Sequence, residues 1–122
     1  MNITSEPITL FGPSESYDFI ILEDQAWNEG PYVLKKDGHY YMTYSANCYH
    51  TRDYCICLAK AEKPMGPFQK SGPVMICGVK GEDFSGPGHN AFFYDHDGNL
   101  KMTFHIHTFD DAPSPNRKAC IC

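Results

Sequence analysis

The chain has 122 residues, which is enough for one domain with a hydrophobic core of its own. Its residues are 42% hydrophobic and 20% charged, and no apolar run approaches the ~20 residues that a membrane-spanning helix needs. The net charge of -5 argues against nucleic acid and against anionic membranes as partners.

Two features of the chain bear on its cellular compartment. Residues 1–14 lack a basic segment followed by an apolar one, so no signal peptide is visible. The six cysteines include no CxxC pair, which argues against a zinc ribbon or a thioredoxin-type site. We interpret four of them as small buried thiols on packed strand faces, namely Cys55, Cys57, Cys120 and Cys122. Both features favour a cytoplasmic location.

The middle of the chain predicts four antiparallel strands. Residues 31–36 and 39–45 flank Asp37-Gly38, a strong signal for a two-residue hairpin. Residues 52–61 predict a third strand, which a Pro- and Gly-rich turn follows. The fourth strand is expected over residues 68–70 and 73–77. Apolar residues rarely recur at a spacing of three to four, so we expect no helix.

The C-terminal part of the chain repeats this pattern. Asp97-Gly98 lies 60 residues after Asp37-Gly38, and in both copies a strand with Met and Thr at matching positions follows. A later match joins residues 52–57 to residues 117–122, with extra loop residues between. Two matches in the same order indicate an internal repeat. The second copy predicts strands over residues 90–95, 99–107 and 117–122.

A repeated unit of four antiparallel strands is typical of a β-propeller blade. We therefore predict an all-β chain with antiparallel four-stranded blades, about two blades of an incomplete propeller. Residues 25–82 form the first blade, and residues 83–122 form a second blade that lacks its fourth strand. Residues 1–24, with strand candidates at 8–11 and 17–22, are expected to be outer strands of a preceding blade or of one exchanged with a neighbouring chain.

The repeat also locates a candidate site. Counting back eight residues from each Asp-Gly pair gives Glu29 in the first copy and His89 in the second. Both positions precede an innermost strand, where the blades of a propeller converge on a central funnel. Neighbouring Gly and Pro residues can hold the chain open so that one polar side chain points inward. An acid and an imidazole facing one axis are a plausible catalytic pair.

An ordered series of short motifs resembles glycoside hydrolase family 43. The series runs from Trp27 to the C-terminus, and His105 and Arg117 extend it. Its motifs are Glu29-Gly30-Pro31, Asp37-Gly38-His39-Tyr40-Tyr41, Tyr44-Ser45, Gly66-Pro67-Phe68 and Gly86-Pro87-Gly88-His89.

The resemblance implies a five-bladed propeller that cleaves arabinose- and xylose-containing plant saccharides and inverts the anomeric carbon. It implies that Glu29 is the general acid, which protonates the departing oxygen. It also implies that His89, His105 and Arg117 contact the bound sugar. Trp27, directly before this motif, is a candidate for stacking on a sugar face. The resemblance requires no cofactor, although some members hold a metal ion, so a calcium ion near His89 is compatible with it.

The chain lacks the second carboxylate of that mechanism. Inversion needs an acid and a base roughly 6.5–9.5 Å apart, with a water molecule between them. In the family, the base and a further aspartate lie on earlier blades. Asp18, Glu23 and Asp24 precede Glu29, but none of them lies in a motif that matches those aspartates. We therefore expect the isolated chain to be inactive.

Two alternatives remain open. The chain is either part of a hydrolase that associates with its missing blades, or a carbohydrate-binding module whose copies assemble into a propeller-like ring that holds sugar without cutting it. A third, lesser reading places a transition metal on His89, His105 and His107, because residues two apart on a strand share a face. We expect no dedicated metal site.

Overall fold

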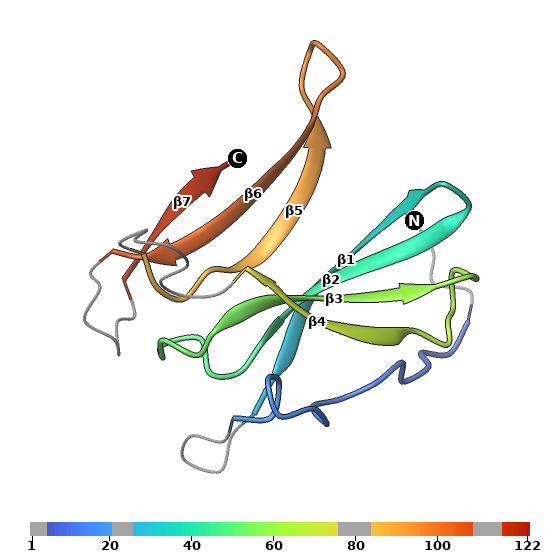
Figure 1. The fold of residues 1–122 in the computed structure, drawn as a ribbon, viewed down its shortest axis with the longest axis horizontal. Helices are drawn as coiled ribbons and strands as arrows, with labels where there is room; N and C mark the ends of the chain where they lie inside the picture. The colour runs from blue at the N-terminus through green and yellow to red at the C-terminus, as the bar shows by residue number, and fades with distance from the viewer. Residues whose placement is uncertain (1–4, 21–25, 76–83, 109–115) are drawn as a thin grey trace.

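The computed structural model describes residues 5–20, 26–75, 84–108 and 116–122 (Figure 1). Within these ranges the chain forms seven strands in two antiparallel sheets and no helix, as the sequence predicts. In the same ranges, no helix of the length and apolarity needed to cross a membrane is found.

The first sheet is the complete four-stranded blade. It contains β1 (Asn28–Lys36), β2 (His39–Ala46), β3 (Cys55–Ala61) and β4 (Gln69–Met75) in that spatial order. The core of the molecule lies on one face of β2 and β3, where alternate side chains point the same way. Its buried members are Met42, Tyr44, Ala46, Cys55, Cys57, Ala59, Ala61 and Phe68.

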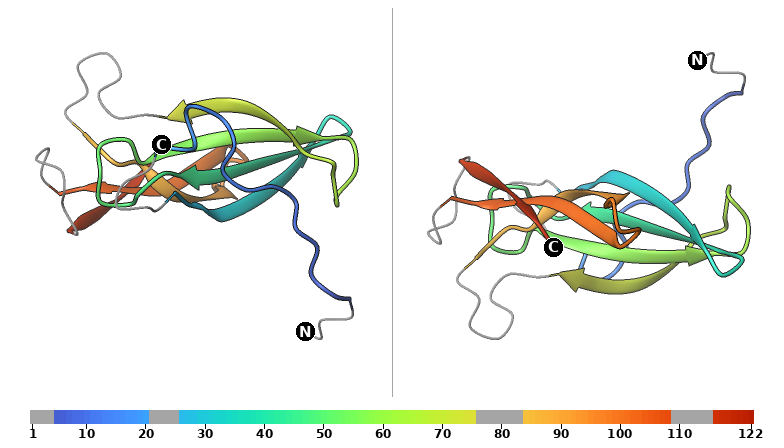
Figure 2. Two further views of the ribbon diagram at one scale, coloured as in Figure 1. Left: turned by 90° about the horizontal axis from the view of Figure 1, so that it is seen from below. Right: turned by 90° about the horizontal axis from the view of Figure 1, so that it is seen from above.

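The second sheet has three strands, β5 (Gly88–Tyr94), β6 (Leu100–His107) and β7 (Arg117–Ile121), in sequence order. It meets the first sheet through β5, which packs on β1 and β2 (Figure 2). Cys120 is only half-buried and Cys122 is exposed, so the prediction of buried thiols holds for Cys55 and Cys57 and is wrong for this strand. Cys120 lies in β7 and Cys122 directly follows it, and among the described strands β7 pairs with β6 alone, at the outer edge of its sheet.

The two hairpins differ in length. Asp37 and Gly38 have φ of 48° and 79°, the left-handed values that a two-residue turn of this type requires. In the second copy, β5 ends at Tyr94 and β6 begins at Leu100, so the loop spans five residues. The Asp95 carboxylate holds that loop, since its Oδ1 accepts hydrogen bonds from the amides of Asp97 and Asn99 at 3.0 and 2.8 Å. The hairpin predicted at Asp97-Gly98 therefore forms, but its loop is longer than the two-residue turn at Asp37-Gly38.

The longer loop shifts the register of the repeat by one residue. Glu29 lies opposite Ser45 in the first sheet, whereas Gly88 lies opposite His105 in the second. Each inner strand then bulges, and the first bulged residues, Gly30 and His89, have similar φ of 56° and 52°. The structural equivalent of Glu29 is thus Gly88, and His89 matches Gly30, one residue from the predicted pairing.

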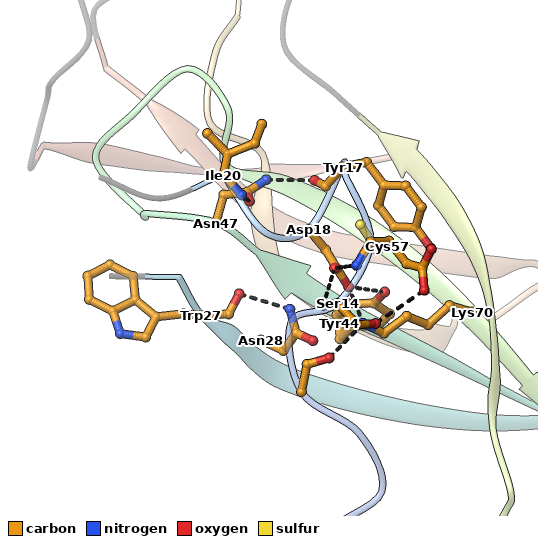
Figure 3. Close-up of polar contacts among 12 residues, drawn as sticks. Ser14, Tyr17, Asp18, Ile20, Trp27, Asn28, Tyr44, Asn47, Cys57 and Lys70 are labelled. Atoms are coloured by element: carbon orange, nitrogen blue, oxygen red, sulfur yellow. Dashed lines mark hydrogen bonds and ion pairs between the residues drawn. The ribbon is translucent and has the colours of Figure 1, made fainter. Parts of the chain in front are cut away.

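Residues 5–20 contain no strand, although the sequence predicts strands at 8–11 and within 17–22; residues 21–22 lie outside the described ranges. Pro7 and Pro13 lack the amide hydrogens that a ladder needs. The segment instead follows an irregular path along the first sheet, where side chains satisfy its backbone (Figure 3). Asn47 accepts a hydrogen bond from the Ile20 amide at 3.0 Å and donates one to the Tyr17 carbonyl at 2.9 Å.

A buried ion pair anchors this N-terminal segment. Asp18 is fully buried, and its carboxylate accepts hydrogen bonds from Lys70 Nζ at 2.5 Å and from the Tyr44 hydroxyl at 3.1 Å (Figure 3). Burial disfavours the ionised form, but the bonds from Lys70 and from the amides of Ser14 and Glu15 outweigh it and lower the pKa of Asp18. Asp18 is therefore a structural carboxylate of the first blade.

Candidate active site

Glu29 lies at the bulge of β1, where the first sheet faces the second. Its side chain is half-buried, and Tyr54 donates a hydrogen bond of 2.6 Å from its hydroxyl to Glu29 Oε1. Tyr54 is fully buried just before β3, at the same edge of the sheet. Burial first, and then the bond to Glu29, raise the pKa of Tyr54 above its usual value, so its phenol stays protonated.

His105 of β6 extends this pair into the second sheet. Its imidazole stacks on the Tyr54 ring with centroids 5.7 Å apart and planes 8° apart. Burial and the neighbouring positive charge of Arg117 lower the pKa of His105 to about 4. The imidazole beside Glu29 is therefore neutral near pH 7.

His89 lies beside Glu29 on the adjoining blade. Its amide donates a hydrogen bond of 2.6 Å to Ser45 Oγ, and its ring lies against Gly30, where an added Cβ would be 3.2 Å from the imidazole. The His89 and His105 rings are 6.4 Å apart. Because His89 is exposed, its imidazole is accessible to a ligand.

Arg117 and Trp27 lie around the same site. The Arg117 guanidinium is 3.5 Å from His105 Nε2 and lies over the Tyr49 ring at 4.7 Å. Trp27 also stacks on Tyr49, with centroids 5.8 Å apart and an interplanar angle of 28°. The Tyr49 ring therefore contacts both Trp27 and Arg117, two of the site residues that the sequence singled out.

The five residues singled out from the sequence are thus joined by contacts at one edge of the two sheets. Glu29, His89 and His105 surround the junction of the blades, whereas Trp27 and Arg117 reach it through Tyr49. Their roles as acid and sugar contacts remain predictions.

Sequence reasoning assigned no role in the site to Tyr54 and Tyr49, nor to Ser45, although Ser45 stands in one of the motifs of the resemblance. Alternate strands of an antiparallel sheet run the same way, so the residues that precede β1 and β3 lie at one edge, together with the end of β2. Applied to Glu29, this rule points to Ser45 and to the segment 47–54. Only the side-chain contacts show that Tyr54 is the residue that reaches the carboxylate.

The three histidines do not form a metal site. His107 is buried, and its Nδ1 and Nε2 lie 2.8 Å from Ser85 Oγ and 2.9 Å from the Tyr49 carbonyl, so both nitrogens are occupied. Among the described residues, no three His, Cys, Asp or Glu side chains converge. Calcium prefers several oxygen ligands. The described residues therefore do not fit a calcium ion at His89 by themselves.

A model of the family described as glycosyl hydrolases family 43 matches residues 4–122. The chain belongs to glycoside hydrolase family 43. A thermostable family-43 glycoside hydrolase of known structure is 40% identical and superposes with a TM-score of 0.87 over 98% of this chain and 39% of its own. An endo-1,4-β-xylanase from Bacteroides thetaiotaomicron is 34% identical, with a TM-score of 0.76 over 91% of this chain and 37% of its own.

Two curated relatives carry more specific names. An extracellular exo-α-(1→5)-L-arabinofuranosidase of Streptomyces chartreusis is 33% identical over 88% of this chain and 35% of its own length. A β-D-galactofuranosidase of Aspergillus niger is 29% identical over 85% of this chain and 30% of its own length. The family-43 chain thus spans about a third of these relatives, and its two sheets are blades of an incomplete β-propeller.

Proposed function

We propose that this family-43 chain supplies the general-acid side of a glycosidase active site, with Glu29 as the acid. The observation that carries the proposal is the setting of Glu29: a half-buried carboxyl group, held by Tyr54 at 2.6 Å, at the edge where the exposed imidazole of His89 meets it from the next blade. A carboxyl group fixed on rigid strands suits proton donation to a leaving oxygen.

The base comes from outside the described residues. Asp18 does not serve as one, because it is fully buried and bonded to Lys70 and Tyr44. Glu23 and Asp24 lie outside the described residues. In the proposed reaction, a carboxylate of another blade takes a proton from water, the water attacks the anomeric carbon, and Glu29 protonates the departing oxygen. The configuration is inverted because the water attacks the face opposite to the leaving group.

The proposed substrates are oligosaccharides or polysaccharides that contain arabinose or xylose. Relatives named as an arabinofuranosidase and a xylanase support this class, and the galactofuranosidase extends it to another furanoside. His89 and His105 are proposed to contact the sugar, with Arg117 and Trp27 at the periphery. Because the imidazole of His105 is neutral near pH 7, it forms no ion pair with Glu29.

Complementation with the missing blades tests this function. The 122-residue chain is co-expressed with the part of the thermostable family-43 hydrolase that it does not match, and the complex is assayed on aryl arabinofuranosides and xylosides. Glu29→Gln should abolish turnover of substrates with poor leaving groups and spare those with good leaving groups, which need no acid. Proton NMR of the first product anomer reports inversion.

Glu62→Gln provides the matched control, since Glu62 is exposed in the turn after β3 and undergoes the same chemical change. Its turnover should equal that of the unmodified complex. Equal losses for both variants, or full activity of Glu29→Gln on poor leaving groups, would contradict the assignment. A discrete oligomer of the chain alone that binds sugar without turnover, measured by light scattering, would favour the binding module.

A further inference from the structure

We propose that Tyr54 is a positioning residue that determines which oxygen of Glu29 carries the transferable proton, through a hydrogen bond from a ring that the neighbouring blade holds in place. This inference rests on the proposed role of Glu29. It assigns a second residue to the same reaction and a function to the contact between the two blades.

A hydrogen bond joins the two blades next to Glu29, which lies opposite Ser45 in the first sheet. The His89 amide lies 2.6 Å from Ser45 Oγ, and a backbone amide can only donate, so Ser45 Oγ is the acceptor.

The hydrogen bond from Tyr54 distinguishes the two oxygens of Glu29. The Tyr54 hydroxyl donates to Glu29 Oε1 at 2.6 Å. Burial keeps the phenol protonated, so this donor persists across the working pH range. An oxygen that accepts a short hydrogen bond is the poorer place for the acidic proton. The proton of Glu29 therefore resides on Oε2, which is free to meet a leaving oxygen.

The surroundings hold the Tyr54 ring in place. One face stacks on His105 with an interplanar angle of 8°. Gly88 of β5 leaves room for the ring, since a Cβ at this position would lie 2.0 Å from Tyr54 Cε1. Tyr54 is thus packed by the second blade as well as bonded by the first. The contact between the two blades therefore also holds the tyrosine that orients the acid.

The kinetic test uses Tyr54→Phe in the complemented enzyme. The variant keeps the ring and loses the hydroxyl, so kcat should fall about tenfold to a hundredfold on substrates with poor leaving groups, as for the loss of a hydrogen bond to a charged group. Turnover of substrates with good leaving groups does not depend on the acid, so it should change by less than about threefold. The KM for both classes of substrate should also change by less than about threefold.

Tyr44→Phe is the matched control. Tyr44 is an equally buried tyrosine of the same blade, and its hydroxyl donates to Asp18, away from Glu29. It should lower the melting temperature without changing the dependence on the leaving group. Tyr54→Phe with the leaving-group dependence of the unmodified enzyme would overturn the inference. Full activity of Glu29→Gln would instead overturn the proposed function, so the two failures are distinguishable.

A measurement on the 122-residue chain alone decides the question even if the complex does not assemble. With ¹³C in glutamate carboxyl groups, the Glu29 resonance is identified by its loss in Glu29→Gln. Exchange from H₂O into D₂O should shift this resonance through the Tyr54 hydrogen bond, in the unmodified chain and in Tyr44→Phe. Absence of the shift in the unmodified chain, or its persistence in Tyr54→Phe, would overturn the inference.

Discussion

The amide of His89 donates a hydrogen bond of 2.6 Å to Ser45 Oγ, and this contact joins the two blades beside Glu29. It exists because His89 takes a left-handed conformation, with φ of 52°, at the bulge of β5. An ordinary strand residue would place its amide in the ladder with β6 instead. The bulge therefore serves the interface, and the histidine side chain remains exposed at the site.

The first prediction concerns Gly88 at this interface. In Gly88→Ala the new methyl group would lie 2.0 Å from Tyr54 Cε1, so the ring has to leave its stack on His105 and its bond to Glu29. We expect a loss of about 3 kcal/mol of unfolding free energy, typical of overpacking a close-packed site. Urea unfolding measures the loss. Gly12→Ala is the control, because no described residue other than its two chain neighbours lies within 4 Å of an added Cβ, and an equal loss there would contradict the argument.

A second prediction concerns the ion pair that anchors the N-terminal segment. Lys70→Met removes the cation and leaves the buried carboxylate of Asp18 unpaired, which costs about 3–5 kcal/mol in comparable sites. Asp18→Asn combined with Lys70→Met should cost less than the two single changes added together, since no buried charge remains. Thermal unfolding of the four chains measures this coupling. Additive costs would show that the pair is not coupled.

The ion pair of Asp18 and Lys70 also predicts that the stability of the folded chain depends on pH in the acidic range. The pKa of Asp18 is lower in the folded chain than its ordinary value of 3.8, so the folded state binds fewer protons than the unfolded state. The resulting stability is present above pH 3.8 and is lost as the pH falls through the lowered pKa. Asp18→Asn should lack this part of the acid dependence, whereas Lys60→Met, which removes an exposed lysine of β3, should retain it.

A third prediction concerns Asn47, which is buried and has φ of 69°. Its Nδ2 donates to the carbonyls of Tyr17 and Asp53, both at 2.9 Å. Asn47→Asp keeps the shape but points a carboxylate at two carbonyl oxygens, whereas Asn47→Gly tolerates the φ and removes the side chain. We expect stability at pH 7 to fall from Asn to Gly to Asp, with losses of about 2 kcal/mol or more for Asp. An Asn47→Asp variant that is more stable than Asn47→Gly at pH 7 would contradict this interpretation.

Local signals predict the strands and the first hairpin well. The alternation of apolar residues in β2 and the left-handed turn at Asp37-Gly38 are properties of short segments, so the sequence carries them directly. The place of Glu29 at the blade junction also followed from the repeat, although the matched position is Gly88. The one-residue error arose because the Asp95 side chain holds a longer second turn, which the shared Asp-Gly pair conceals.

The sequence pattern does not predict contacts between side chains that are far apart along the chain. Asp18 and Lys70 are 52 residues apart, and nothing local distinguishes their side chains from solvated charges. Tyr54 likewise lies in a segment that resembles an ordinary core strand, while its hydroxyl reaches a carboxylate 25 residues earlier. Such pairs depend on how β1, β3 and the N-terminal segment are placed together, which is a property of the whole fold.

The last prediction concerns the titration of His105. Burial and the charge of Arg117 lower its pKa from 6.5 to about 4, so the unfolded chain binds a proton there more readily than the folded one. Stability from this group is therefore complete above pH 6.5 and is lost as the pH falls towards 4. The His105 Cε1 proton should titrate with a midpoint near 4 by NMR. Arg117→Gln should raise that midpoint only in part, because burial is the larger cause, and Lys118→Gln, on the same strand, should leave it nearer 4. A midpoint near 6.5 in the unmodified chain would show that His105 is solvated, and that the stack with Tyr54 which places it beside Glu29 does not form.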